Sequence, residues 1–174
     1  MKNLFMFRLA NFFLFQAGWW LAVATDYSWR VVAVMLLAVA NSLLPDWQYS
    51  RLVGVFSIAM VGVINDYILM LTGVLIFPED PMFLPFWFCS IWLIFVSTFH
   101  LSLSFLYNIP VYQQALLSAV GASMSYGFGA QIAGISSVVS QPYFTLVIAV
   151  DFALLVPVLL FIYSRLLKSI NHGM

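Results

Sequence analysis

Apolar residues fill long stretches of this chain, and short groups containing Pro, Asn, Asp or Gln separate one stretch from the next. Continuous apolar runs are typical of membrane helices, whereas the strands of a membrane barrel alternate between apolar and polar positions. The pattern therefore predicts six helices, at residues 4–24, 29–44, 52–77, 83–106, 114–137 and 143–166. The third is long for a perpendicular span, so we expect it to tilt or to break near Asn65 and Asp66.

The composition indicates that lipid is the main solvent of the chain. Of its 174 residues, 64% are hydrophobic and only 7% are charged, and the mean hydropathy is +1.05. A soluble domain usually carries about 25% charged residues to cover its surface. We therefore predict an all-α fold, a polytopic membrane helix bundle of about six transmembrane helices that forms a single integral membrane domain over residues 1–174.

The few charges are balanced, and their distribution predicts an orientation. A net charge of zero gives no basis for nucleic-acid binding. The single Cys89 and the two histidines show no metal-ligand spacing, so neither a metal site nor a cofactor is predicted. On the six-helix topology only Arg30 falls on the side away from the termini. By the positive-inside rule both termini are predicted in the cytoplasm, together with Lys2, Arg8, Arg51, Arg165 and Lys168.

Two aspartates, Asp66 and Asp151, fall inside predicted helices at similar depth. A charged side chain at the centre of a bilayer costs about 2.5–3.5 kcal/mol, so both should point into the bundle rather than toward lipid. A pair of carboxyls in such a place can act as general acid and base or exchange protons, and both are candidate catalytic residues. The alternative is a hydrogen-bonded polar cluster that only fixes how the helices pack.

Further polar side chains are candidates to line the same interior site. The candidate substrate-binding residues are Gln16, Asn65, Tyr126, Gln131 and His100. Gln16 is predicted at about the depth of the two aspartates, whereas His100 lies nearer the cytoplasmic side. A lone histidine in an apolar helix is more often a packed, hydrogen-bonded residue than a ligand, and the neighbouring Ser and Thr hydroxyls offer it partners.

Small residues recur every four positions in the fifth predicted helix, at Gly121, Ser125, Gly129 and Ala133. They form a flat ridge on one helix face, as in the small-xxx-small pattern that brings membrane helices close together. We expect this small-residue ridge to pack against another helix, in the bundle or in a partner membrane protein. The alternative is that the hydrocarbon chain of a ligand lies against the ridge.

Five segments carry a resemblance to a known family: "NFFLFQAGWW", "NDYILMLTGVLIF", "LPFWFCSIWLIFVSTFHLSL", "VGASMSYGFGA" and "DFALLVPVLL". In this order they resemble a family of small bacterial multi-pass inner-membrane proteins of unknown function. The resemblance implies a compact helix bundle in the bacterial inner (cytoplasmic) membrane and a connection with membrane lipid. The family-like positions are Asn11, Gly18, Trp19, Asp66, Gly73, Pro85, Trp87, Trp92, Tyr126, Gly129 and Asp151.

The segment from Asp66 to the Pro78-Glu79-Asp80 turn is also similar to bacterial membrane-bound lycopene cyclases. Those proteins have an aspartate, a glycine and then a proline-acidic motif at a membrane edge. The paired-glutamate form of that motif is absent from this chain. The similarity implies apolar isoprenoid or acyl substrates.

Three functions fit the sequence. The first is a protein that acts on or with membrane lipid, on acyl or isoprenoid chains, through an interior site containing Asp66 and Asp151. It predicts an apolar cavity that opens sideways and ends at the two carboxyls. The second is a small transporter or proton-linked carrier, which predicts a route to water on both sides and inverted repeats. The third is an accessory or assembly subunit, which predicts a structural polar core without a cavity.

Overall fold

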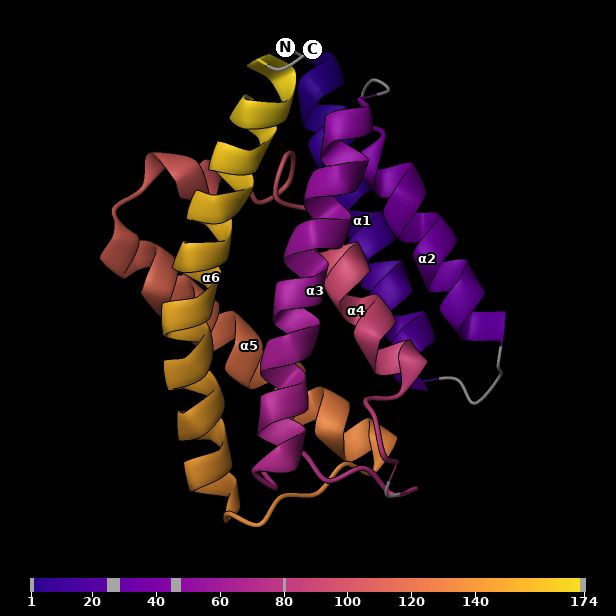
Figure 1. Cartoon of the computed structure of the whole chain (residues 1–174), viewed down its shortest axis with the longest axis vertical. Coiled ribbons are helices and arrows are strands. Elements are labelled where there is room, and N and C mark those ends of the chain that lie inside the picture. The colour runs from indigo at the N-terminus through magenta and orange to yellow at the C-terminus, as the bar shows by residue number, and fades with distance from the viewer. Residues whose placement is uncertain (1, 25–28, 45–47, 80, 173–174) are drawn as a thin grey trace.

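The computed structural model describes residues 2–24, 29–44, 48–79 and 81–172. Within these ranges the chain is all-helical, with six α-helices and no named β-strand (Figure 1), which confirms the predicted all-α class. The first, second, fifth and sixth predicted helices match α1, α2, α5 and α6 to within a few residues at most ends. The elements are α1 (Lys2–Ala24), α2 (Trp29–Ser42), α3 (Tyr49–Leu71), α4 (Phe86–Val96), the 3₁₀ helix η1 (Ser104–Asn108), α5 (Val111–Ala133) and α6 (Gln141–His172).

α3 and α6 run roughly along the long axis of the molecule, whereas α5 crosses it obliquely (Figure 1). The start of α1 and the end of α6 lie at one end, and the loops that follow α3 and α5 lie at the other. α5 packs mainly against α6, while α4 lies among α1, α2 and α3. The largest apolar core forms where these helices meet and includes the buried rings of Trp92, Phe99 and Tyr163.

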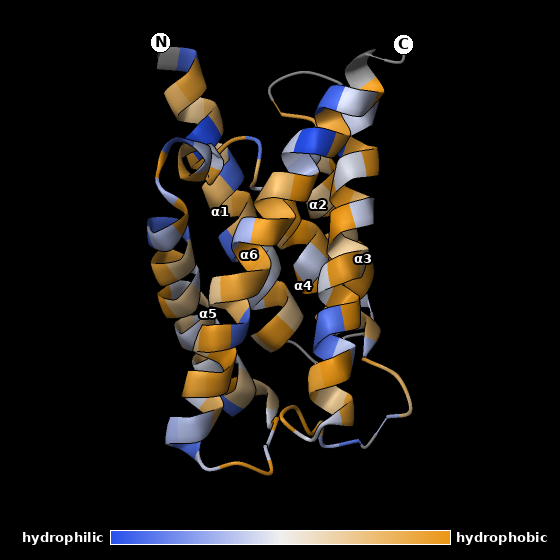
Figure 2. Cartoon of the chain, turned by 60° about the vertical axis from the view of Figure 1, so that its left-hand side comes forward, coloured by the Kyte–Doolittle hydropathy of each residue, from blue (hydrophilic) through white to orange (hydrophobic). Residues whose placement is uncertain are grey.

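Two of the described helices, α3 and α6, have the length and apolar composition of membrane spans, over Tyr49–Leu71 and Gln141–Ile170. α2 and α4 are apolar but shorter than the roughly 20 residues that cross a bilayer. Figure 2 shows apolar residues along much of the length of the helices, interrupted by hydrophilic ones both near the ends and within α3 and α6. Six membrane spans with cytoplasmic termini stay a prediction.

The fourth predicted helix, at residues 83–106, is wrong in its second half. α4 ends at Val96, and residues 97–103 continue as successive turns before η1. The hydroxyls of Ser97 and Thr98 hydrogen-bond back to carbonyls three residues earlier, at 2.7 and 2.6 Å. Local bonds of this kind compete with the regular helical pattern, and an apolar run alone does not reveal them.

Buried amide side chains hold this irregular segment in place. Asn11 Nδ2 donates to the Ser97 carbonyl at 3.1 Å and to Asn41 Oδ1 at 2.8 Å. Asn11 Oδ1 accepts a hydrogen bond from the Ser102 N–H at 3.0 Å, and Asn41 Nδ2 donates to Ser97 Oγ at 2.9 Å. Both asparagines are fully buried. The Asn11 side chain of α1 thus satisfies backbone groups that a continuous helix would satisfy internally, and Asn41 of α2 bonds the Ser97 hydroxyl, so non-helical backbone is tolerated inside the bundle.

The third predicted helix, at residues 52–77, ends earlier than predicted and does not break near Asp66. α3 is continuous past this residue and stops before Gly73, whose φ of 74° lies in the left-handed region that glycine adopts easily. Val74 and Leu75 then donate back to the Leu69 carbonyl, and Ile76 exchanges two backbone hydrogen bonds with Ser136, both at 2.9 Å. The loops after α3 and α5 therefore close one end of the bundle together.

We predict that Asn11→Leu destabilises the protein by about 2–4 kcal/mol. Leucine has a similar volume but leaves the Ser97 carbonyl, the Ser102 N–H and Asn41 Oδ1 without the hydrogen bonds that the Asn11 side chain makes to them, and each unsatisfied group costs about 1–3 kcal/mol. The free energy of unfolding, measured in detergent by titration with SDS, reports the change. Asn108→Leu at an exposed position is the control. An Asn11→Leu variant as stable as wild type would contradict the assigned role of this network.

Candidate functional site

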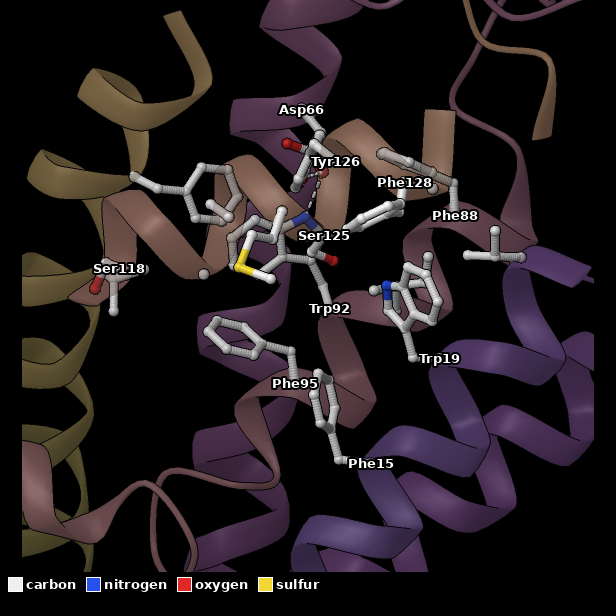
Figure 3. Close-up of a pocket in the computed structure, with 18 of the residues that line it drawn as sticks. Phe15, Trp19, Asp66, Phe88, Trp92, Phe95, Ser118, Ser125, Tyr126 and Phe128 are labelled. Carbon is white, nitrogen blue, oxygen red and sulfur yellow. Dashed lines mark hydrogen bonds between the residues drawn. The ribbon is translucent and has the colours of Figure 1, made fainter. Parts of the chain in front are cut away.

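A cavity of about 760 Å³ lies between α1, α4 and α5 (Figure 3). Its walls are mostly aromatic and aliphatic, and they include the rings of Phe15 and Trp19 from α1 and of Trp92 from α4. Along α5 the lining runs from Leu117 to Ile132, which at 1.5 Å per residue corresponds to about 22 Å. The cavity is therefore elongated as well as apolar.

The cavity opens at the side of the bundle, along the face that α1 and α5 share. Its lining residues with exposed side chains include Trp20 on α1 and Leu117, Met124, Phe128 and Ile132 on α5. These rim side chains are all apolar or aromatic. In a membrane, an opening with such a rim would connect the cavity to the hydrocarbon region rather than to water.

The small-residue ridge of α5 lines this cavity. Gly121, Ser125 and Gly129 are wall residues, and Ala133 lines a smaller neighbouring pocket. A Cβ added at Gly121 would meet no atom within 4 Å, and one at Gly129 would meet the Trp19 ring at 3.5 Å. The prediction that the ridge packs closely against another helix is therefore wrong at Gly121, within the described part of the bundle. Binding of a partner membrane protein to the ridge stays a prediction.

Asp66 brings a buried carboxyl to the wall of the cavity. Its Oδ2 accepts hydrogen bonds from Trp92 Nε1 at 2.6 Å and from the Tyr126 hydroxyl at 2.7 Å (Figure 3). Its Oδ1 is also buried and has no hydrogen-bond partner among the described residues. A buried polar atom without a partner costs about 1–3 kcal/mol, and a ligand with a hydrogen-bonding group would offset this cost.

Gly62, one turn before Asp66 on α3, makes room for the Trp92 ring. A Cβ at this position would lie 2.2 Å from the indole, much closer than atoms can approach. The Phe152 ring of α6 stacks on the same indole, with centroids 5.6 Å apart and planes inclined by 16°. Packing from α3 and α6 thus fixes the ring whose N–H donates to Asp66.

Asp151 forms a separate polar pair. Its Oδ2 accepts a hydrogen bond from Asn65 Nδ2 at 2.8 Å, which joins α6 to α3. Both side chains are partly buried, and neither residue lines the cavity. Asp66 and Asp151 therefore lie in the same region of α3 and α6 but hydrogen-bond to different partners, so the cavity has one carboxyl in its wall rather than two.

The other candidate residues divide between the cavity and the rest of the bundle. Gln16 and Tyr126 line the cavity, whereas Gln131 is exposed and lies outside it. His100 is not a lining residue either, and its Nε2 lies 2.7 Å from the Leu44 carbonyl, just after α2. A substrate-binding role for any of these side chains stays a prediction. In the part of the chain that the structure describes, no three His, Cys, Asp or Glu side chains gather as metal ligands would.

Trp92 belongs to this site although sequence reasoning gives it no binding role. A buried indole N–H usually finds an acceptor, and this rule could have linked a tryptophan to Asp66. The chain has six tryptophans, however, and aromatic residues of membrane proteins commonly lie at the interfaces. The rule therefore could not single out Trp92 before the fold was known.

Comparison with known proteins identifies one family. A model of the family described as a protein of unknown function, DUF2878, matches residues 8–158, which include Asp66, Trp92 and Tyr126. No curated protein and no solved structure matches the chain. The similarity to lycopene cyclases therefore gains no support. Of the acidic turn on which that similarity rests, Glu79 is exposed and Asp80 lies outside the described residues.

We predict that Gly62→Ala disrupts this site, whereas Gly127→Ala does not. The new methyl group at position 62 must displace the Trp92 ring and break its hydrogen bond to Asp66, and overpacking of this kind costs about 1–3 kcal/mol. A Cβ at Gly127 meets no atom within 4 Å, so alanine there should be neutral or stabilising by up to about 1 kcal/mol. Unfolding in detergent and near-ultraviolet circular dichroism measure both effects. Unchanged stability and spectrum in Gly62→Ala would contradict the packing described.

Proposed function

We propose that this chain, which belongs to the DUF2878 family of proteins of unknown function, is an integral membrane protein that binds the hydrocarbon chain of a lipid in its lateral cavity. Asp66 is the polar contact of this site, and acyl or isoprenoid chains are the ligand class. The observation that carries the proposal is the elongated apolar cavity with one buried carboxyl in its wall.

The exposed surface of the helices supports a lipid environment. Large apolar side chains on the outward faces of five helices are 55–69% exposed, at Phe5, Leu36, Ile64, Leu116 and Leu154. Soluble monomers rarely expose large apolar patches, and here large apolar side chains are exposed on five helices. In the most apolar stretches of α3 and α6, only 39% and 28% of the residues are buried, so these are not the central helices of a soluble core. Together with the composition, this favours a bundle that is surrounded by lipid.

The dimensions of the cavity favour a long, thin and apolar ligand. A volume of about 760 Å³ lies within the roughly 300–1,000 Å³ that is usual for small-molecule sites. Its length of about 22 Å along α5 and its apolar rim suit a hydrocarbon chain that enters sideways from the bilayer. The small residues Gly121, Ser125 and Gly129 leave the wall flat enough for such a chain to lie against α5.

The position of Asp66 favours a ligand with a hydrogen-bonding or reactive group partway along its chain. Tyr126, whose hydroxyl donates to Asp66, lies near the middle of the α5 stretch that lines the cavity. The carboxyl is therefore beside the cavity rather than at its end. Trp92 and Tyr126 both donate to Oδ2, whereas the buried Oδ1 has no hydrogen-bond partner among the described residues.

The other two functions have less support. A proton-linked carrier needs a water-accessible path, and the cavity that contains Asp66 is lined mostly by Phe, Trp, Leu and Ile side chains. An accessory subunit with a purely structural polar core accounts for the Asn11–Asn41 network but gives no reason for a cavity beside Asp66. We therefore favour lipid binding over both.

We predict that Gly121→Phe blocks lipid binding without unfolding the protein. Both Gly121 and Gly127 have open space around a new Cβ, but only Gly121 lines the cavity, so Gly127→Phe is a matched control. Radiolabelled palmitate binding to the purified protein in detergent should fall about tenfold or more in Gly121→Phe and stay near wild type in Gly127→Phe. Wild-type affinity in Gly121→Phe, or equal losses in both variants, would argue against the cavity as the binding site.

We also predict that Asp66→Asn changes cellular lipids as a deletion does. Asparagine keeps the shape of the side chain but removes the carboxyl. A whole-lipid mass spectrum of a deletion strain, complemented with wild type or with a stably inserted Asp66→Asn variant, makes the comparison. A lipid species that only the wild-type gene restores would support chemistry or binding at Asp66. Full restoration by Asp66→Asn would leave Asp66 with a structural role alone.

A further inference from the structure

A second, smaller pocket adjoins the lipid cavity at one end of the bundle. Its volume is about 230 Å³, and Val23, Trp87 and Ile132 line both spaces. Unlike the cavity, this pocket contains two charged residues, Arg30 and Glu79. The same three side chains therefore separate an apolar space from a polar one, which is the arrangement that an amphiphilic ligand requires.

Arg30 presents its charge at this boundary. Its guanidinium lies 5.0 Å from the centroid of the Trp87 ring, a distance typical of a cation–π contact. A guanidinium can form two parallel hydrogen bonds to a carboxylate or phosphate. Trp87 also lines the lipid cavity, so the charge lies next to the place where a chain would end.

The pocket lies at the end of the bundle, where a head-group site of a membrane protein is expected. It lies where α1 and α5 end and where the loop after α3 closes the bundle, at the end opposite the start of α1 (Figure 1). If α3 and α6 span the bilayer, this end lies at headgroup depth. Arg30 is the one basic residue that the predicted topology assigns to this side, whereas the other basic residues belong to the opposite end.

We propose that this pocket binds the anionic head group of an amphiphile whose hydrocarbon chain occupies the neighbouring cavity. The inference rests on the proposed function, because it takes the cavity to be a lipid site. Arg30 is the residue that binds the head group, and a single carboxylate or phosphate is small enough for about 230 Å³. Glu79 lines the same pocket and opposes an anion there, but its side chain is exposed and its charge is screened by water.

Three ligands with the same sixteen-carbon chain distinguish the contribution of the head group to binding from that of the chain. They are hexadecanoate, hexadecyl phosphate and the neutral hexadecanol. Each is titrated into the full chain in detergent, for wild type and for Arg30→Gln, Glu79→Gln and Gly121→Phe. Arg165→Gln is the matched control, because Arg165 also stacks on an aromatic ring, that of Phe161 at 5.1 Å, but lies far from the pocket along α6.

We expect wild type to bind at least one anionic ligand more tightly than hexadecanol. Arg30→Gln should weaken binding of the anions about tenfold or more and leave hexadecanol unchanged, because it removes one charge-assisted interaction. Glu79→Gln should tighten anion binding about two- to threefold, and Arg165→Gln should match wild type. Preference for the phosphate would point to a phospholipid-type head group, and preference for the carboxylate to a free fatty acid.

The outcomes distinguish this inference from the proposed function. If Arg30→Gln keeps the preference for anions while Gly121→Phe blocks all three ligands, the head-group site is wrong and the lipid cavity stands. Weaker anion binding in Glu79→Gln would also overturn the head-group site as described. If wild type binds none of the ligands, or if Gly121→Phe binds them all normally, the proposed function itself fails.

Discussion

One oxygen atom of Asp66 joins three helices, and the geometry of the cavity depends on this constraint. Oδ2 accepts the Trp92 N–H from α4 and the Tyr126 O–H from α5, so the carboxyl on α3 sets where both aromatic rings lie. Gly62 makes the approach possible, because any side chain there would overlap the indole. The rings that bind Asp66 are also walls of the cavity. The same contacts that pack the bundle therefore shape its apolar interior.

The bundle contains a second polar cluster, around Asn11 and Asn41. Comparing it with the cluster around Asp66 distinguishes a structural network from a candidate functional site. In the cluster around Asn11 and Asn41, side-chain donors and acceptors pair with one another and with backbone groups of the segment after α4. Such a network is costly to disturb and needs no ligand. At Asp66 one buried oxygen has no partner among the described residues, and that carboxyl borders a cavity. The Tyr163 hydroxyl is also buried without a hydrogen-bond partner in the described part of the chain, but it does not line the cavity, so the unpartnered oxygen and the cavity together mark Asp66 as the functional candidate.

Much of the helical pattern follows from apolar runs and breakers, whereas the ends of two helices do not. The end of α3 depends on Gly73 and on pairing between Ile76 and Ser136, which come from distant parts of the chain. The segment that follows α4 bonds to Asn11, a residue far away in the sequence. The Ser102 N–H donates to Asn11 Oδ1 across a separation of 91 residues. The predicted depth of Asp66 in the membrane is enough to predict that its side chain points into the bundle, because ionisable groups avoid lipid. Depth does not predict that Asp66 and Asp151 have different hydrogen-bond partners, because the partners depend on the direction in which each helix face points.

The non-helical segment after α4 has a consequence for the order of assembly. A helix can enter the bilayer alone because its backbone groups bond to one another. In residues 97–103, however, two backbone groups bond to the Asn11 amide of α1, and the Ser97 hydroxyl accepts a hydrogen bond from Asn41 of α2. If this stretch lies in a bilayer, its backbone groups are satisfied only once α1 packs beside it. In that case α1 and α2 must be in place before the segment after α4 reaches its final position. A truncation that removes α1 and α2 would leave the Ser97 carbonyl and the Ser102 N–H without the side chain that bonds both of them.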